Sequence, residues 1–515
     1  MAMESCTMTK KLEVHFILIP LMSAGHVLPI VDLAKLLGRR NNVKVTIMTT
    51  PVNAVRVGAN IDREIQCCGS SISVQPFRFP SVEAGLPEGC ESSEAVPCPD
   101  LMYNFAKATT MLQKPVEEAL EKIVIPTIPT CFILDKNLPF LFDVAKKFKV
   151  PIIISDALNC FSLLCNHNLF HSKVYENVSE SESFVVPGLP HRIVFKKYQL
   201  QEYFSMNVGE FNVLREKVWQ NEGEAFGVLV NSFQELEEEY VKEFTRLTGH
   251  KVYCVGPLSL VNKEHKDKAQ RGKLDSKEEE EEGEYLRWLD SWPATSVIFA
   301  NLGSLTFVPP GQVMEIILGL EASKRPFIWV LIMRDAHKRK ELNKLLKEDG
   351  VEERVKGRGL IIRGWVPQIL ILSHTAIGAF LTHCGWNSTL EGITSGVPLI
   401  TFPLTAEQFY NEKVAVQLLE TGVRVGVEKA MHFEVEDKSG IQVRREKVKE
   451  AIEKVMGEED EESKRIRERA GNYREKANKA MEKGGSSYLN LSLMIEDIKQ
   501  HFRRRVEDDD SKSEP

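Results

Sequence analysis

The sequence has few cysteines and no arrangement of them typical of a disulfide scaffold or a structural zinc site. Ten cysteines are spread over 515 residues, and none are paired in a C-x-x-C motif. Such sparse cysteines argue against a disulfide framework, and the missing C-x-x-C pairs argue against zinc. We therefore expect reduced thiols and a cytoplasmic protein, with peripheral association with the endoplasmic reticulum left open.

An excess of basic charge and a long apolar run are also missing. Lys and Arg number 66 against 73 Asp and Glu, a net charge of -7. This balance excludes the basic field that attracts proteins to nucleic acids. No window of eighteen apolar residues occurs, so we expect no transmembrane segment, and the apolar stretch near the start is too short for a signal peptide. The expected partner is a small molecule, and we expect a monomer.

Apolar runs of strand length alternate with amphipathic runs of helix length. This alternation predicts βαβ units around a parallel, buried sheet. Strands are expected at residues 14–19, 43–48, 131–134, 152–154, 227–230 and 252–255, and again at 296–300, 327–332, 360–362, 377–382, 399–402 and 423–427. The fold class is therefore α/β, with two Rossmann-like doubly wound domains facing across a cleft.

Composition divides the chain near Pro257. Residues 263–285 have almost no apolar content and include five consecutive glutamates at 278–282, which predicts a solvated, mobile linker. We expect an N-terminal domain at 1–257 and a C-terminal domain at 258–485. A final helix at 486–502 is expected to pack back on the N-terminal domain, ahead of a disordered tail at 503–515.

Residues 365–408 contain the most informative motif. A buried strand at 377–382 leads through His383-Cys384-Gly385 into a predicted helix, with Ser388 and Glu391 spaced as in a capping box. A helix N-terminus at the carboxyl end of a strand offers free N–H groups that suit a diphosphate. The turn by itself is equally compatible with an ordinary βα connection.

Over all 44 positions, this segment resembles the plant secondary-product signature of the family 1 UDP-dependent glycosyltransferases. It begins with W-x-P-Q, contains H-C-G-W-N-S, has E-G at the expected distance and ends on an acidic residue followed by Gln. The resemblance implies a GT-B type fold and a UDP-sugar as donor substrate. It also implies that neither a metal nor another cofactor is needed.

The resemblance assigns donor-binding roles one residue at a time. Uracil would stack on Trp365 and bond to the Val366 backbone, and the ribose hydroxyls would be bound by Gln368 and Glu391. The resemblance implies diphosphate binding by His383, Asn387, Ser388 and Ser304, and sugar binding by Trp386, Glu407 and Gln408. The final Gln is usual in glucose users, whereas Glu407 stands where many relatives have Asp.

His26, in S-A-G-H-V-L-P after the first predicted strand, is the candidate base. It lies where a βα loop ends and a helix begins, and we expect the positive helix end to lower its pKa and keep it neutral. By resemblance it matches the catalytic base of the family. Asp135, which ends the strand C-F-I-L-D, matches the aspartate that orients this base, and Asp156 is the rival for that role.

The predicted reaction is a direct displacement that inverts the anomeric carbon. The paired carboxylates of glycosidases are missing, and the first βα turn lacks the glycine trio of dinucleotide-binding proteins. Alternatives are the same fold with UDP-galactose or UDP-glucuronate, and a non-catalytic UDP-sugar-binding protein.

The acceptor is expected to be lipophilic and to bear a hydroxyl group. The stretches at 77–89 and 160–165 resemble a subgroup of plant enzymes that act on flavonoids, triterpenoid sapogenins and other lipophilic alcohols. Phe140, Phe161 and Leu189 are candidate acceptor contacts. Broad apolar walls suit a flavonoid and a triterpenoid sapogenin equally.

Overall fold

The computed structural model describes residues 13–124, 129–201, 204, 209–272, 279–303, 308–431, 440–457 and 459–513. Its first half is built on a seven-stranded parallel sheet in the order β3-β2-β1-β4-β5-β8-β9. These strands are β1 (Val14–Ile19), β2 (Val43–Thr49), β3 (Ile72–Pro76), β4 (Cys131–Asp135), β5 (Ile152–Asp156), β8 (Gly227–Val230) and β9 (Lys251–Cys254).

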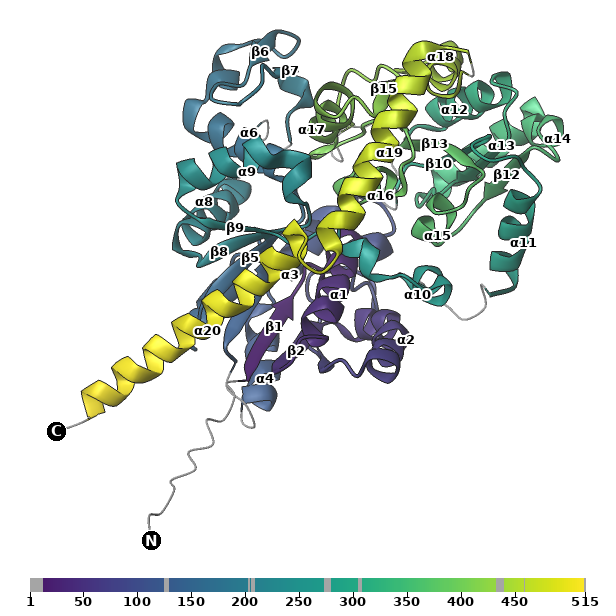
Figure 1. Ribbon diagram of the computed structural model, residues 1–515. Helices are drawn as coiled ribbons and strands as arrows, with labels where there is room; N and C mark the ends of the chain where they lie inside the picture. The colour runs from purple at the N-terminus through teal and green to yellow at the C-terminus, as the bar shows by residue number, and fades with distance from the viewer. Residues whose placement is uncertain are drawn as a thin grey trace.

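The second half is built on a six-stranded parallel sheet in the order β12-β11-β10-β13-β14-β15. Its strands are β10 (Val297–Asn301), β11 (Phe327–Val330), β12 (Gly359–Ile362), β13 (Ile377–Thr382), β14 (Leu399–Thr401) and β15 (Gly422–Arg424). A small antiparallel pair, β6 (Ser183–Val185) and β7 (Val194–Lys196), stands apart from both sheets (Figure 1).

Helices connect the strands and cover both sheets. In the first half they are α1 (Ala24–Gly38), α2 (Pro51–Cys68), α3 (Met102–Thr110), α4 (Gln113–Val124), α5 (Leu141–Lys146), α6 (Cys160–Ser172), α8 (Gly209–Glu224) and α9 (Gln234–Thr248). From the linker onward they are α10 (His265–Gln270), α11 (Glu279–Asp290), α12 (Pro310–Ala322), α13 (Ala336–Asp349), α14 (Val351–Arg354), α15 (Gln368–Leu372), α16 (Trp386–Ser395), α17 (Gln408–Lys413), α18 (Arg445–Met456), α19 (Glu461–Met481) and α20 (Ser486–Ser513). No helix within the described ranges is long and apolar enough to cross a membrane.

Strand β1 shows why the first sheet has two buried faces. Phe16 and Leu18 pack in the layer that contains α1, α2 and α20, whereas Ile17 and Ile19 pack in the layer that contains α3, α4 and α5. Successive side chains of a strand point to opposite faces, so an all-apolar run is stable only between two helical layers. The expected α/β fold with two Rossmann-like halves is confirmed. All the strands predicted from apolar runs are present, and only the short or weakly apolar β3, β6 and β7 were missed.

The final helix α20 runs back along the first half of the molecule (Figure 1). Leu491, Met494 and Ile498 are buried against the layer of α1, and the Tyr253 hydroxyl donates to Asp497 at 2.7 Å. The helix continues to Ser513, so the prediction of a disordered tail from residue 503 was wrong up to that point. Neither Gly nor Pro interrupts the sequence between Phe502 and Ser513, which permits the helix to continue.

The linker is also more ordered than its composition suggested. Residues 265–270 form α10, residues 279–290 form α11, and the Arg271 side chain between them is only 8% exposed. The prediction of a mobile segment was therefore wrong for its described part, because its charges pair with partners on both halves. Arg63 of α2 binds Asp267 at 2.7 Å, and Lys268 donates to Ser373 at 3.2 Å. Residues 273–278 lie outside the described part of the chain.

Candidate functional site

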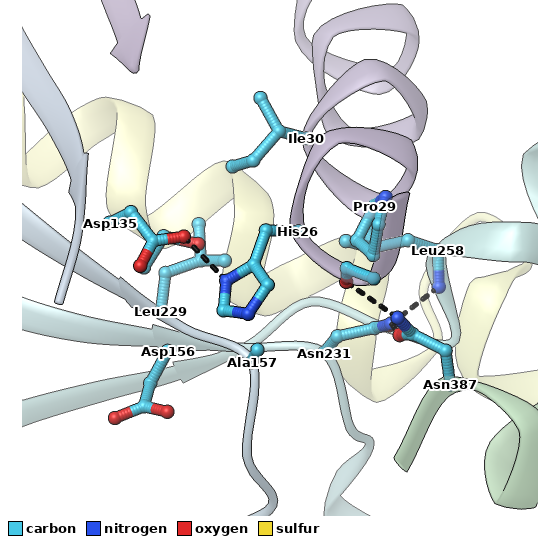
Figure 2. Close-up of a pocket in the computed structure, with 12 residues that line it drawn as sticks. His26, Pro29, Ile30, Asp135, Asp156, Ala157, Leu229, Asn231, Leu258 and Asn387 are labelled. Atoms are coloured by element: carbon cyan, nitrogen blue, oxygen red, sulfur yellow. Dashed lines mark hydrogen bonds and ion pairs between the residues drawn. The ribbon is translucent and has the colours of Figure 1, made fainter. Parts of the chain in front are cut away.

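His26 and Asp135 meet at the carboxyl edge of the first sheet. His26 is the third residue of α1, and Asp135 is the last residue of β4. The His26 Nδ1 atom lies 2.7 Å from Asp135 Oδ2 (Figure 2), and the two side chains are 18% and 3% exposed. Asp135 is itself held by the backbone N–H groups of Leu21 and Asn137, which donate to Oδ2 and Oδ1. These two hydrogen bonds hold the carboxylate in the position from which it orients the imidazole.

Asp156, the rival partner, makes no direct contact with His26. Its carboxylate lies 3.1 Å from the Lys136 ammonium and accepts the Leu158 N–H, and in Figure 2 it points away from the imidazole. Lys136 also binds Glu222. The geometry therefore favours Asp135 over Asp156 as the partner of the candidate base.

The predicted direction of the His26 pKa shift was wrong. Burial lowers the pKa of His26, but the charge and hydrogen bond of Asp135, with the charges of Asp156 and Glu407, outweigh burial and raise it above its ordinary value. The sequence argument considered only the helix end. That argument could not include Asp135, Asp156 and Glu407, whose carboxylates come from distant parts of the chain.

A pocket beside His26 reaches from the first half to the second. It is lined by Gly25, His26, Pro29, Ile30, Asp135, Ser155, Asp156, Ala157, Leu229, Asn231, Leu258 and Asn387. Asn231 was missed from the sequence, although it directly follows a predicted strand at the sheet edge where ligands gather. Its Oδ1 accepts the Leu258 N–H at 2.9 Å, and its backbone carbonyl accepts the Trp386 indole N–H at 2.8 Å.

Helix α16 begins earlier than predicted. Gly385 is its N-cap, Trp386 is its first residue, and no side chain caps it. The predicted capping box of Ser388 with Glu391 was therefore wrong. Ser388 lies inside the first turn instead, where its hydroxyl accepts Gln368 Nε2 at 3.0 Å. The N-terminus of α16 touches α1, because Asn387 Nδ2 donates to the Gly25 carbonyl at 2.6 Å.

Two of the residues expected to bind the nucleoside, Gln368 and Glu391, belong to one polar cluster. Gln368 Nε2 donates to Glu391 Oε2 at 2.7 Å, and Gln368 Oε1 accepts Asn301 Nδ2 at 2.8 Å. Trp365 is half-buried and Val366 is buried just before α15. The chain therefore places an aromatic ring and an oriented carboxylate in one region, a combination suited to a nucleoside.

His383 directly follows β13 and lies between Gly303 and Gly385. A Cβ atom at Gly303 or Gly385 would lie 2.7 or 2.5 Å from His383 Nε2, so any larger residue at either position would collide with the imidazole. Burial lowers the pKa of His383 to about 4, which keeps it neutral near pH 7. It can therefore offer a neutral N–H group, while positive potential comes from the α16 N-terminus.

The three residues expected to contact the sugar lie near one another. Trp386 is 2% exposed, and its backbone N–H donates to Glu407 Oε1 at 3.3 Å. Burial raises the pKa of Glu407. Gln408 is 8% exposed, and its Oε1 accepts the backbone N–H groups of Leu404 and Thr405 at 2.8 and 3.1 Å.

The remaining predicted residues are Ser304 and the three acceptor candidates. Ser304 lies outside the described residues. Phe161 is fully buried with its ring against Tyr240, and Phe140 lies beneath the Lys217 ammonium. Leu189 packs on a core cluster that contains residues of both halves. Among the described residues, none of the three acceptor candidates lines the pocket beside His26, because that pocket is built from strand ends and α1.

Comparisons with known proteins show which family this chain resembles. A family model described as UDP-glucoronosyl and UDP-glucosyl transferase matches residues 270–454. The chain is 45% identical to UDP-glycosyltransferase 73C3 of Arabidopsis thaliana over 490 residues, which is 95% of this chain and 97% of that protein. The crystal structure of Glycyrrhiza uralensis UGT73P12 complexed with glycyrrhetinic acid 3-O-monoglucuronide matches with a TM-score of 0.85 and 32% identity, covering 97% of this chain and 99% of that one. The structure of Phytolacca americana UGT2 complexed with UDP-2fluoro-glucose and pterostilbene matches with a TM-score of 0.72 and 26% identity, covering 94% and 100%.

Proposed function

This chain belongs to the plant family 1 UDP-dependent glycosyltransferases, which transfer a sugar from a UDP-sugar to a small acceptor, and we propose that it transfers glucose from UDP-glucose to a hydroxyl of a lipophilic plant metabolite. The observation that carries the proposal is the 2.7 Å contact between His26 Nδ1 and Asp135 Oδ2 beside a pocket that reaches the second half of the molecule.

His26 is the general base of the proposed reaction. Asp135 accepts a hydrogen bond from the Nδ1–H group, which leaves the lone pair on Nε2 free for the acceptor hydroxyl. As the acceptor oxygen bonds to the anomeric carbon, its proton passes to Nε2 and the bond between that carbon and the diphosphate oxygen breaks. Attack opposite the leaving group inverts the anomeric carbon. Asp135 then stabilises the imidazolium.

The departing UDP carries the negative charge of the broken bond. The N-terminus of α16 with Asn387 and Ser388, together with neutral His383, is the group of donors that would hold the diphosphate. The half-buried Trp365 would stack on uracil, and Glu391 would accept hydrogen bonds from the ribose hydroxyls. Ser304 keeps its proposed diphosphate role from the resemblance alone.

Glucose is the proposed sugar, and a triterpenoid sapogenin or a flavonoid is the proposed acceptor. Gln408 matches the residue usual in glucose users, and the complex of Phytolacca americana UGT2 contains UDP-2fluoro-glucose. The complex of Glycyrrhiza uralensis UGT73P12 contains glycyrrhetinic acid 3-O-monoglucuronide, and that of UGT2 contains pterostilbene. The ligands of both complexes support a lipophilic hydroxyl compound as the acceptor.

The test is product detection with a matched set of donors. Purified protein is incubated with UDP-glucose, UDP-galactose or UDP-glucuronate and a panel of flavonoids and triterpenoid sapogenins, and products are identified by mass spectrometry. We expect one added hexose with UDP-glucose on at least one panel member, and NMR of the product should show a β-linked sugar. A product formed only with another donor would contradict the glucose assignment. UDP binding without transfer to any acceptor would contradict the enzymatic role.

A further inference from the structure

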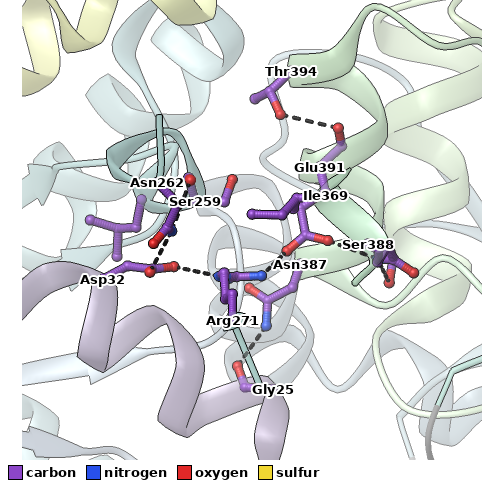
Figure 3. A network of polar contacts seen from close by, with 12 residues as sticks. Gly25, Asp32, Ser259, Asn262, Arg271, Ile369, Asn387, Ser388, Glu391 and Thr394 are labelled. Carbon is purple, nitrogen blue, oxygen red and sulfur yellow. Dashed lines mark hydrogen bonds and ion pairs between the residues drawn. The ribbon is translucent and has the colours of Figure 1, made fainter. Parts of the chain in front are cut away.

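Arg271, in the linker between the two halves, contacts the carboxylate expected to bind the donor ribose. Its Nη1 donates to Glu391 Oε1 at 2.6 Å, and its Nε donates to Asp32 Oδ2 at 2.8 Å (Figure 3). The Arg271 side chain is 8% exposed, and the two carboxylates are 5% and 1% exposed. Burial opposes the charge of Arg271, but Asp32 and Glu391 outweigh it and raise its pKa above the ordinary value. The guanidinium is thus a permanent bridge between two buried carboxylates.

On the side of the first half, Asp32 is part of a closed polar cluster. Its Oδ1 accepts Asn262 Nδ2 at 2.8 Å, and the buried Lys35 ammonium donates to Asn262 Oδ1 at 2.8 Å. Asp32 and Lys35 lie on α1, the helix whose first turn contains the candidate base His26. The anchor of Arg271 is therefore the same rigid element that carries the base.

On the side of the second half, the Glu391 carboxylate has two hydrogen-bond partners within the described part of the chain, one for each oxygen. Gln368 donates to Oε2 at 2.7 Å while Arg271 donates to Oε1. A carboxylate offers about four lone-pair sites, so two remain for other donors. These two partners on opposite oxygens fix the plane of the carboxylate without filling it.

The next residue continues the linker toward the predicted uracil platform. Gly272 has φ +85°, and a Cβ atom there would lie 3.1 Å from Leu28 Cδ1 and 3.5 Å from Trp365 Nε1. The linker backbone is thus packed between α1 and Trp365. Arg271 and Trp365 consequently belong to one contiguous wall.

We propose that Arg271 is a positioning residue for the donor substrate, which orients Glu391 toward the ribose diol and ties that carboxylate to helix α1. The proposal rests on the proposed function, because it assumes that Glu391 accepts the ribose hydroxyls. It assigns a specific role in nucleotide recognition to a residue from a linker whose composition suggested only a solvated connection.

The experiment compares UDP with 2′,3′-dideoxy-UDP, which lacks both ribose hydroxyls, by calorimetric titration of the full chain. The wild type should bind UDP more tightly by about tenfold or more, the effect of one hydrogen bond to a charged group. In Arg271→Met this preference should fall to less than about threefold, chiefly through weaker UDP binding. Arg271→Lys keeps a cation but cannot bridge both carboxylates, and it should give an intermediate preference.

Arg63→Met is the matched control. It removes the 2.7 Å ion pair with Asp267, which anchors the same linker to the first half without contact to Glu391. This variant should keep the wild-type preference for UDP. Because Arg271→Met leaves two buried carboxylates without their cation, thermal unfolding is recorded for each variant, and Arg271→Lys carries the test if the methionine variant does not fold.

Three results would overturn the proposal. Equal weakening of both nucleotides in Arg271→Met would make the residue purely structural, and tighter UDP binding would mean that Arg271 competes with the ribose. Unchanged affinity for both nucleotides would remove any role in recognition. A wild type that binds both nucleotides equally would instead show that Glu391 is not the ribose site, so the donor-site assignment under the proposed function would fail with it.

Discussion

At the scale of single residues, the site depends on a balance between burial and charge. His26 is deprived of solvent, which favours its neutral form, yet Asp135 touches it and two further carboxylates act on it from a distance. Burial raises the pKa of Asp135. The charge and hydrogen bond of His26 lower that pKa by more than burial raises it, so the net shift is downward. The pair therefore behaves as an imidazole whose basicity is strengthened and whose tautomer is fixed.

Asp135→Asn should alter both the level and the pH dependence of transfer. The neutral imidazole is the active base, so kcat/KM falls as pH drops through the raised pKa of His26. Without the Asp135 charge that pKa falls, and the acid limb should move to lower pH. The plateau should fall by about 10²- to 10⁴-fold because the tautomer is no longer fixed. The measurement is kcat/KM across about pH 5 to 9.

Asp156→Asn is the comparison variant for that experiment. It removes a charge that raises the pKa of His26 without a direct contact to the imidazole. We expect a shift of the acid limb in the same direction and a much smaller loss of the plateau. If Asp135→Asn left the acid limb in place, the proposed electrostatic control of His26 would be wrong.

At the scale of secondary-structure elements, buried strands were predictable and helix starts were not. An uninterrupted apolar run such as β13 (Ile377–Thr382) is stable as a strand buried between two helical layers, because both of its faces are apolar. The start of α16 was misplaced because Ser388 and Glu391 have the spacing of a capping box, but their side chains bind Gln368 and Arg271, which come from other segments. A rule based on local spacing fails where the same side chains bind residues that are distant in sequence.

Helix α20 allows a matched test of its packing on the first half. Leu491 is 2% exposed and Leu493 is 52% exposed, so the two lie on opposite faces of one helix although both are leucines in an apolar stretch. Leu491→Ala should lower the free energy of unfolding by about 2–5 kcal/mol, because it leaves a cavity. Leu493→Ala should change it by at most about 0.5 kcal/mol. Urea denaturation followed by circular dichroism measures both, and equal effects would contradict the packing.

At the scale of the whole molecule, the two halves meet through side chains that are far apart in sequence. Asn387 of α16 donates to Gly25 of α1, and Arg271 bridges Asp32 and Glu391. The two-sheet architecture could be predicted from apolar alternation, and the signature at 365–408 could name donor-site candidates, because both are local patterns. The contacts of Arg271 and Asn231 could not be predicted. Their neighbours in sequence, a charged linker and a strand end, do not indicate which distant residues they contact.

The most direct test of the central claim is His26→Ala compared with the wild type. UDP binding is measured by calorimetric titration, and hexose transfer from UDP-glucose to an accepted flavonoid or triterpenoid sapogenin is measured by mass spectrometry. We predict nearly unchanged UDP affinity, because the proposed UDP contacts come from the second half, and a loss of transfer of about 10²-fold or more. Transfer at the wild-type rate, or loss of UDP binding together with transfer, would contradict the assignment of His26 as the base.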